Sequence, residues 1–332
     1  MIPGSLLLRS LLVPALVLAV VGGFSLQLND YMVYVALVAT IWAIFAVGYD
    51  VLLGYTGYLS LAHGALFGIG AYAFALLTTS LGWNFWLALF AAASVTAVAG
   101  ALVGAAAFRT RGIYFAVLTL GIGLVGYQVF LVLESVTGGI AGFMGIPGPP
   151  DLSASLSSGQ NNLLVSLIVL WVTWVCATGF VRSRIGAACI AVREDQMLAR
   201  SLGIKVGVAR LAAFAFSSFF CGAAGGLFAA SSSYIGPDSF TVMNTGFHVV
   251  VLVVVGGMGT LWGPILGAVL LTVLPESLRM ASTLSLLIYA ALLLGCILLA
   301  PQGIAGALKS AVAAFPPARR LMGAVAVKER IP

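Results

Sequence analysis

The chain has 332 residues, of which 62% are hydrophobic and only 7% are charged. A soluble globular protein carries about 25% charged residues, so this chain has too few polar side chains to coat a water-facing surface. The composition therefore excludes a soluble domain and indicates a polytopic membrane protein. The net charge of +6 does not indicate a nucleic-acid partner, because Lys and Arg cluster between hydrophobic runs, as in cytoplasmic loops.

The hydrophobic runs predict helices, since a spanning helix needs about 20 apolar residues and a membrane β-strand only about 10 of alternating polarity. In chain order the runs cover residues 1–25, 31–53, 61–81, 83–108, 112–133, 163–181, 211–230, 246–258, 261–274 and 284–300. We expect an all-α transmembrane bundle of about ten helices, and the pattern leaves open re-entrant segments and an inverted repeat. Because 246–258 and 261–274 are short, eight full spans with a re-entrant pair are the alternative.

The distribution of charge predicts how the chain is oriented. Three predicted loops hold no Lys or Arg: 27–30, 134–162 and 231–245. Basic residues lie at the other ends of the runs: Arg9, Arg109, Arg111, the segment 182–210 and the tail, with Arg279 as the exception. Cytoplasmic loops carry the excess of Lys and Arg, so both termini are expected in the cytoplasm. We expect one transmembrane domain over 1–310 and a basic cytoplasmic tail over 311–332.

The longest polar interruption is residues 182–210, which hold six of the fifteen Lys and Arg residues. Its middle predicts a short helix. Leu198 and Leu202 are spaced i, i+4, so they are expected on one face of that helix.

The ends of this short helix are also marked in the sequence. Glu194 and Asp195 are expected in its first turn and Arg200 in its last, the arrangement that a helix dipole favours. Gly203 can adopt φ > 0 and stop the helix. Such a capped helix between two hydrophobic segments is either a docking knob for a soluble partner or a charged cytoplasmic loop.

Two similar glycine patterns break a hydrophobic region in each half of the chain. GxxGxL occurs at 54–59 and again at 256–261, which we call the two glycine turns. Paired Gly-interrupted segments point to a transport pathway built from inverted repeats, although glycine also serves close helix packing. The candidate pathway residues are Gly54, Gly57, Ser60, His63, Gly256 and Gly259. For Ser60 and His63, hydrogen-bonded packing is the alternative.

Enzyme motifs are missing from the sequence. A P-loop needs Gly-Lys-Ser/Thr, and none of Lys205, Lys309 and Lys328 follows a glycine. There is no HExxH and no Gly-x-Ser-x-Gly. The two His and four Cys residues form no metal-ligand spacing. We expect no enzyme activity, no cofactor and no metal.

Three acidic residues within or beside hydrophobic runs are functional candidates, because ionisable groups inside a membrane are costly. They are Asp50, Glu134 and Glu276. All three lie near a predicted helix end, where water or lipid headgroups can solvate them, so a proton relay is not favoured.

Five blocks occur in a fixed order: GYTGYLSLAHGALFGIGAY at 54–72, RGIYF at 111–115, and further blocks at 137–147, 193–204 and 256–303. Between Asp50 and Gly303 this series resembles the inner-membrane permeases of branched-chain amino-acid ABC importers, the LivM-type subunit of the LivH/LivM family. The chain departs from the family pattern at Tyr58 and Ala62, where Gln and Gly are frequent.

The resemblance implies a subunit that forms half of a translocation pore for branched-chain or related small amino acids. It implies a sibling permease, two cytoplasmic ATPase subunits and a periplasmic substrate-binding protein, in a bacterial inner membrane. In this family a short cytoplasmic helix enters a groove of the ATPase. The resemblance therefore assigns coupling to Arg193, Glu194, Asp195, Leu198, Leu202 and Gly203, and we call residues 182–210 the coupling segment.

Three alternatives remain open at this stage. The same machine could carry urea, short amides or another small polar metabolite, because the binding protein sets most of the specificity. A stand-alone secondary carrier or channel would need ion coupling through buried charges. A membrane-embedded enzyme would need the catalytic motifs that are missing.

Overall fold

The computed structural model describes residues 29–152, 156–278, 294–295 and 303–307. The longer helices are α2 Asp30–Thr56, α3 His63–Thr79, α4 Phe85–Ala107, α5 Ile113–Val132, α7 Ser158–Arg182, α10 Val206–Ser232 and α12 Trp262–Leu278. The shorter helices are α6 Glu134–Thr137, α8 Arg184–Glu194, α9 Gln196–Ser201 and α11 His248–Gly256. The other elements up to residue 278 are the 3-10 turns η1 Gly139–Ala141 and η2 Pro237–Phe240, the π-helical turn η3 Val242–Phe247 and the strands β1 Phe143–Met144 and β2 Tyr234–Ile235. Residues 303–307 are also helical.

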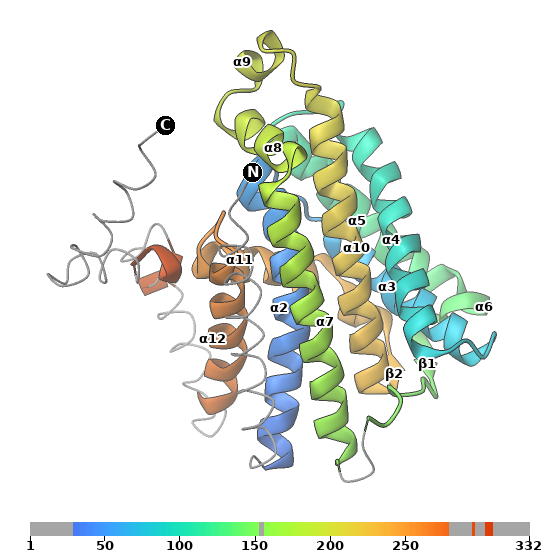
Figure 1. Cartoon of the computed structure of the whole chain (residues 1–332). Coiled ribbons are helices and arrows are strands. Elements are labelled where there is room, and N and C mark those ends of the chain that lie inside the picture. The colour runs from blue at the N-terminus through green and yellow to red at the C-terminus, as the bar shows by residue number, and fades with distance from the viewer. Residues whose placement is uncertain (1–28, 153–155, 279–293, 296–302, 308–332) are drawn as a thin grey trace, which may run out of the picture.

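The long helices run side by side as one bundle (Figure 1). Helices α8 and α9 lie at one end of the bundle, and β1 and β2 lie at the other. Helix α2 is central, and it packs against α7, α10 and α12. Within the described residues five helices, α2, α4, α5, α7 and α10, are long and apolar enough to cross a membrane. The predicted all-α membrane bundle is therefore confirmed.

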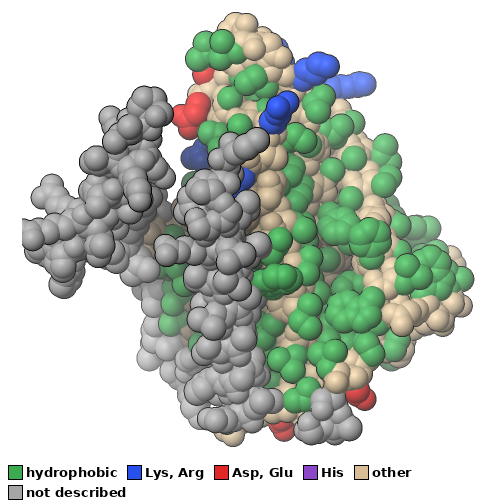
Figure 2. All heavy atoms as spheres, viewed as in Figure 1, with side chains coloured by type: hydrophobic (Ala, Val, Ile, Leu, Met, Phe, Trp, Pro, Cys, Tyr) green, Lys and Arg blue, Asp and Glu red, His purple; other side chains and the backbone are tan. Residues whose placement is uncertain are grey.

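The side chains on the face seen in Figure 2 also differ between the flank of the bundle and its ends. Hydrophobic side chains cover the flank of the bundle, and the Lys and Arg side chains of this face gather at the α8–α9 end. Helix α5 exposes large apolar side chains such as Ile113, Val117 and Val125. Exposed apolar side chains suit contact with lipid or with another membrane subunit.

The predicted runs between 31 and 274 correspond to observed helices, but several boundaries need correction. Helix α10 begins at Val206 and not at 211, and α12 continues to Leu278 and not only to 274. Helix α7 begins at Ser158, before the predicted start at 163, because Ser157 and Gln160 form a capping box ahead of the apolar run. Helix α2 does not end at residue 53 but continues to Thr56, and Gly54 is helical rather than a break. The run 1–25, most of the run 284–300 and the tail 311–332 lie outside the described residues.

Close backbone contacts hold α3 against α10. A Cβ atom at Gly70 would overlap the backbone of Gly222, and one at Gly225 would overlap the Phe67 carbonyl. Small residues allow such approach between membrane helices, where van der Waals packing drives association. This crossing fixes the start of α3, and with it the segment that follows the first glycine turn.

Candidate functional site

The two glycine turns, from opposite halves of the chain, lie in contact. The Asp50 Oδ1 atom accepts a hydrogen bond of 2.9 Å from the Gly259 backbone N–H. A Cβ atom at Gly54 would overlap both the Asp50 carboxylate and the Gly259 nitrogen. The structure therefore brings together the two patterns that the sequence paired only by their spacing.

The glycines of the two turns play matching roles. Gly54 and Gly256 are helical, and a Cβ atom at either would overlap neighbouring atoms. Gly57 and Gly259 have φ of 74° and 72°, a conformation that disfavours residues with a Cβ atom. In each turn the first glycine allows close packing and the second allows the chain to change direction.

Arg193 reaches both turns from the coupling segment. Its guanidinium donates through Nη1 to the Gly54 carbonyl. A Cβ atom at Gly259 would lie 3.0 Å from the same Nη1, and one at Gly57 would lie 3.4 Å from the Arg193 Cγ. Arg193 is in the last turn of α8. One side chain therefore joins the coupling segment to both candidate pathway turns.

The expectation that water or headgroups solvate Asp50 is wrong, because this residue is fully buried. Helix α2 continues past it, and the turn that carries Gly259 covers its carboxylate. Among the described residues, no group donates to the Asp50 Oδ2 atom. Glu134 is exposed, and Glu276 accepts a hydrogen bond from the Tyr31 hydroxyl.

Ser60 and His63 lie inside the subunit, both fully buried. The His63 Nδ1 atom is 3.0 Å from the Ser60 Oγ, and its Nε2 is 2.9 Å from the Ser217 Oγ on α10. The Tyr49 hydroxyl donates to the Ser60 carbonyl at 2.8 Å. Each ring nitrogen thus has a hydroxyl partner, as buried polar groups require. This geometry is that of the hydrogen-bonded packing alternative.

The short helix of the coupling segment is α9. Asp195 caps its N-terminus and accepts hydrogen bonds from Met197 N at 2.7 Å and Leu198 N at 3.0 Å. Gly203 follows its end with φ of 80°, as predicted. The expected place of Glu194 in the first turn is wrong, because a new helix starts at the Asp195 cap and Glu194 is the last residue of α8.

Helix α9 and its C-cap residue Leu202 expose apolar side chains. The exposed fractions are 57% for Leu198, 72% for Leu202 and 68% for Met197. Met197 was not among the predicted site residues, although an apolar residue within a charged segment could have identified it from the sequence. Apolar side chains that project from a charged end of a protein mark a docking surface when they cluster.

A second contact joins the coupling segment to the first glycine turn. The Arg210 Nη1 atom donates to the Tyr58 hydroxyl at 2.8 Å, and the guanidinium lies 5.1 Å from the Tyr58 ring centre and 5.5 Å from that of Phe108. The Gln196 amide oxygen, turned to face these donors, accepts from Arg210 Nη2 at 2.8 Å and Arg200 Nη2 at 3.2 Å. Arg210 is only 3% exposed. Nothing in its sequence neighbourhood distinguishes it from the solvated arginines.

The coupling segment also holds a buried thiol, Cys189 on α8. Its Sγ donates to the Ala209 carbonyl at 3.4 Å, and burial raises the pKa of this thiol to about 11. The protonated thiol is therefore the form present at neutral pH, and it acts as a small packing group between α8 and α10.

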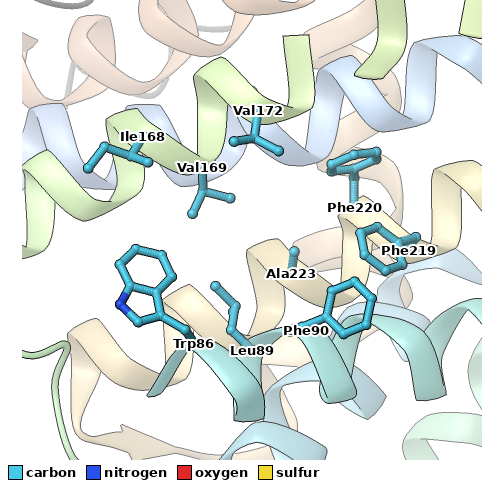
Figure 3. Close-up of a pocket in the computed structure, with 9 residues that line it drawn as sticks. All are labelled: Trp86, Leu89, Phe90, Ile168, Val169, Val172, Phe219, Phe220 and Ala223. Atoms are coloured by element: carbon cyan, nitrogen blue, oxygen red, sulfur yellow. The ribbon is translucent and has the colours of Figure 1, made fainter. Parts of the chain in front are cut away.

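A groove between α4, α7 and α10 has a volume of about 240 Å³ (Figure 3). It is lined by Trp86, Leu89, Phe90, Ile168, Val169, Val172, Phe219, Phe220 and Ala223. None of these side chains is charged, and a zwitterionic amino acid would leave its ammonium and carboxylate groups without partners there. The groove is therefore not the candidate site.

Comparison with known proteins identifies the family. Residues 31–300 match the family described as branched-chain amino acid transport system / permease component. The permease protein LivM of Salmonella typhimurium is 35% identical over 327 residues, which cover 91% of this chain and 76% of that protein. LivM of Escherichia coli is 34% identical, covering 88% and 74%, and LivH of Escherichia coli is 27% identical, covering 80% and 91%.

No solved structure matches the chain. The family match and the LivM relatives confirm the resemblance to the branched-chain amino-acid permeases. The protein is a membrane protein, and it belongs to the family of branched-chain amino acid transport permeases.

Proposed function

We propose that this chain is one of two permease subunits of an ABC importer for branched-chain amino acids in a bacterial inner membrane. A sibling permease supplies the other half of the pore, and two cytoplasmic ATPase subunits drive it. The relatives named as high-affinity branched-chain amino acid permeases support the choice of substrate. Urea and short amides are the alternative cargo of the same machine.

The observation that carries this proposal is helix α9 with its C-cap, which presents Met197, Leu198 and the capping Leu202 at the end of the bundle where basic residues gather. A capped helix with exposed apolar side chains suits insertion into an apolar groove of a soluble partner. We assign coupling to this helix and its flanks: Arg193, Glu194, Asp195, Leu198, Leu202 and Gly203. ATP-driven closure of the ATPases then moves α9.

We assign the transport pathway to the two glycine turns, with Gly54, Gly57, Gly256 and Gly259 as its candidate residues. Their contact at the α8–α9 end supports a role at the cytoplasmic mouth of the pathway. Ser60 and His63 contribute through the packed core behind the first turn.

The opposite end suits a periplasmic substrate-binding protein. Strands β1 and β2 pair antiparallel, with Phe143 opposite Ile235, and so join the two loops that hold no Lys or Arg. The Tyr127 hydroxyl donates to Asp238 at 2.8 Å and ties the second loop to α5. These contacts support a structured docking surface with acidic side chains.

Asp50 is the observation that favours a stand-alone carrier instead, since a buried carboxylate is the group that ion coupling uses. A carrier needs no docking knob, however, and would leave the exposed face of α9 without a role. An ABC importer gives the exposed face of α9 a docking role, and it lets the buried Asp50 carboxylate hold the two glycine turns together.

Substitution of α9 tests the proposal. In the variant Leu198→Glu with Leu202→Glu, charge replaces the apolar knob, and we expect the recovery of co-purified ATPase to fall about tenfold or more. The matched control, Leu198→Met with Leu202→Met, keeps the apolar surface and should retain the ATPase. Undiminished ATPase recovery and uptake in the Glu variant would contradict the docking role.

A further inference from the structure

We propose that Arg193 and Asp50 form a latch that transmits movement of the coupling segment to both glycine turns. The inference rests on the proposed function, because it assumes that ATPase subunits move α9. It adds the route by which that movement reaches the pathway, and it gives the buried acid a role.

The latch is adjacent to α9 in the chain. Arg193 lies two residues before Asp195, the residue that caps α9, and the short distance along the chain forces the two to move together. Arg193 is exposed as a residue, yet its guanidinium donates to the Gly54 carbonyl. A displacement of α9 therefore pulls directly on the backbone of the first glycine turn.

Asp50 connects the second turn to the first. Its Oδ1 accepts from the Gly259 N–H, and it projects from α2 one helical turn before Gly54. The absence of a Cβ atom at Gly54 makes room for this carboxylate. The two turns are thus held against each other by one buried side chain, and separating them requires this hydrogen bond to break.

The charges give the latch two positions. The Arg193 Nη1 atom lies 3.0 Å from the position of a Cβ atom at Gly259, and the Asp50 Oδ1 atom accepts from the Gly259 N–H, so the two side chains approach the same residue. A guanidinium and a carboxylate attract each other. The Asp50 Oδ2 atom has no hydrogen-bond donor among the described residues, although it is buried. A planar guanidinium has several donors, so Arg193 can exchange the Gly54 carbonyl for this oxygen when the coupling segment moves.

The other contact of the coupling segment acts as a fixed point. Arg210 is buried against Tyr58 and Phe108 at the start of α10, and Gln196 of α9 accepts from it. Because α10 is anchored here, movement of α9 is transmitted back along the chain to the end of α8, where Arg193 lies.

The test uses the whole complex, purified with its ATPase subunits and reconstituted in lipid vesicles. The readout is the amount of amino acid taken up per ATP hydrolysed. We expect Arg193→Gln and Asp50→Asn each to lower this ratio about tenfold, within the range of allosteric couplings, while ATPase recovery stays at the parent level. The double variant should lose no more than either single variant, because the two residues act in series along one route from α9 to the glycine turns.

Two controls separate the latch from other roles. Arg109→Gln removes an exposed arginine whose side chain makes no hydrogen bond with the described residues, and it should leave the ratio unchanged. Arg193→Lys restores a donor for the Gly54 carbonyl and should recover part of the loss. If the Asp50→Asn protein does not accumulate in the membrane, the latch is tested by comparing the amount of amino acid taken up per ATP in Arg193→Gln, Arg193→Lys and Arg109→Gln.

Three results would overturn the latch: a normal ratio in Arg193→Gln, losses that add in the double variant, or loss of the ATPase from Arg193→Gln, which would make Arg193 a docking residue. Failure of the proposed function is distinguishable. It would appear as intact ATPase recovery and uptake in the variant Leu198→Glu with Leu202→Glu. If that variant loses the ATPase or uptake while Arg193→Gln keeps a normal ratio, only the latch is contradicted.

Discussion

Single glycines in the two glycine turns carry distinct physical roles that composition cannot separate among forty glycines. Gly54 is required for space, because the Asp50 carboxylate and the Gly259 nitrogen occupy the position of its missing Cβ. Gly57 is required for backbone conformation, since φ of 74° lets it end α2. The spacing pattern alone could locate these residues, but only the fold distinguishes packing from turning.

Gly57→Ala tests the conformational role. The nearest atom to its new Cβ is the Arg193 Cγ at 3.4 Å, an ordinary contact, so the cost comes from the positive φ and should be about 1 kcal/mol. Gly121→Ala is the control, because Gly121 is helical with open space around it and should tolerate alanine. We expect a lower unfolding temperature in detergent for the first variant only. Equal midpoints would show that the strain is relieved elsewhere.

At the scale of helices, the sequence predicts most of the long helices, because the thickness of the bilayer sets their length and apolar composition. An apolar run long enough to span reads as a helix whatever it packs against, and α2 to α5, α7 and α10 follow from that rule. The burial of Asp50 and Arg210 could not be predicted, because each depends on a partner far away in the chain, Gly259 and Tyr58 respectively.

Tyr58→Phe tests the contact between α10 and the first glycine turn. The variant keeps the ring beneath the Arg210 guanidinium but removes the hydroxyl that accepts its hydrogen bond of 2.8 Å. Hydrogen bonds to charged groups contribute about 1.5–3 kcal/mol, so thermal unfolding of the purified protein should shift to lower temperature. Tyr34→Phe, at an exposed position of α2, is the control. A matching response in both variants would contradict the anchoring role of Tyr58.

The whole molecule is polarised from one end to the other. One end carries the coupling segment, the two glycine turns and the arginines, and the other carries the paired loops that hold no Lys or Arg. The central helix α2 links the two ends, since Asp30 starts it and Gly57 ends it. This arrangement suits a subunit that receives substrate at one end and force at the other.

The central claim, that ATPase subunits drive this permease, is tested most directly by purifying the tagged chain from its own membrane in mild detergent. The account predicts that a P-loop ATPase and a second hydrophobic permease co-purify with it, and that uptake of branched-chain amino acids into vesicles requires ATP. Recovery of this chain alone, still moving amino acids in vesicles without ATP, would contradict the account and establish a stand-alone carrier.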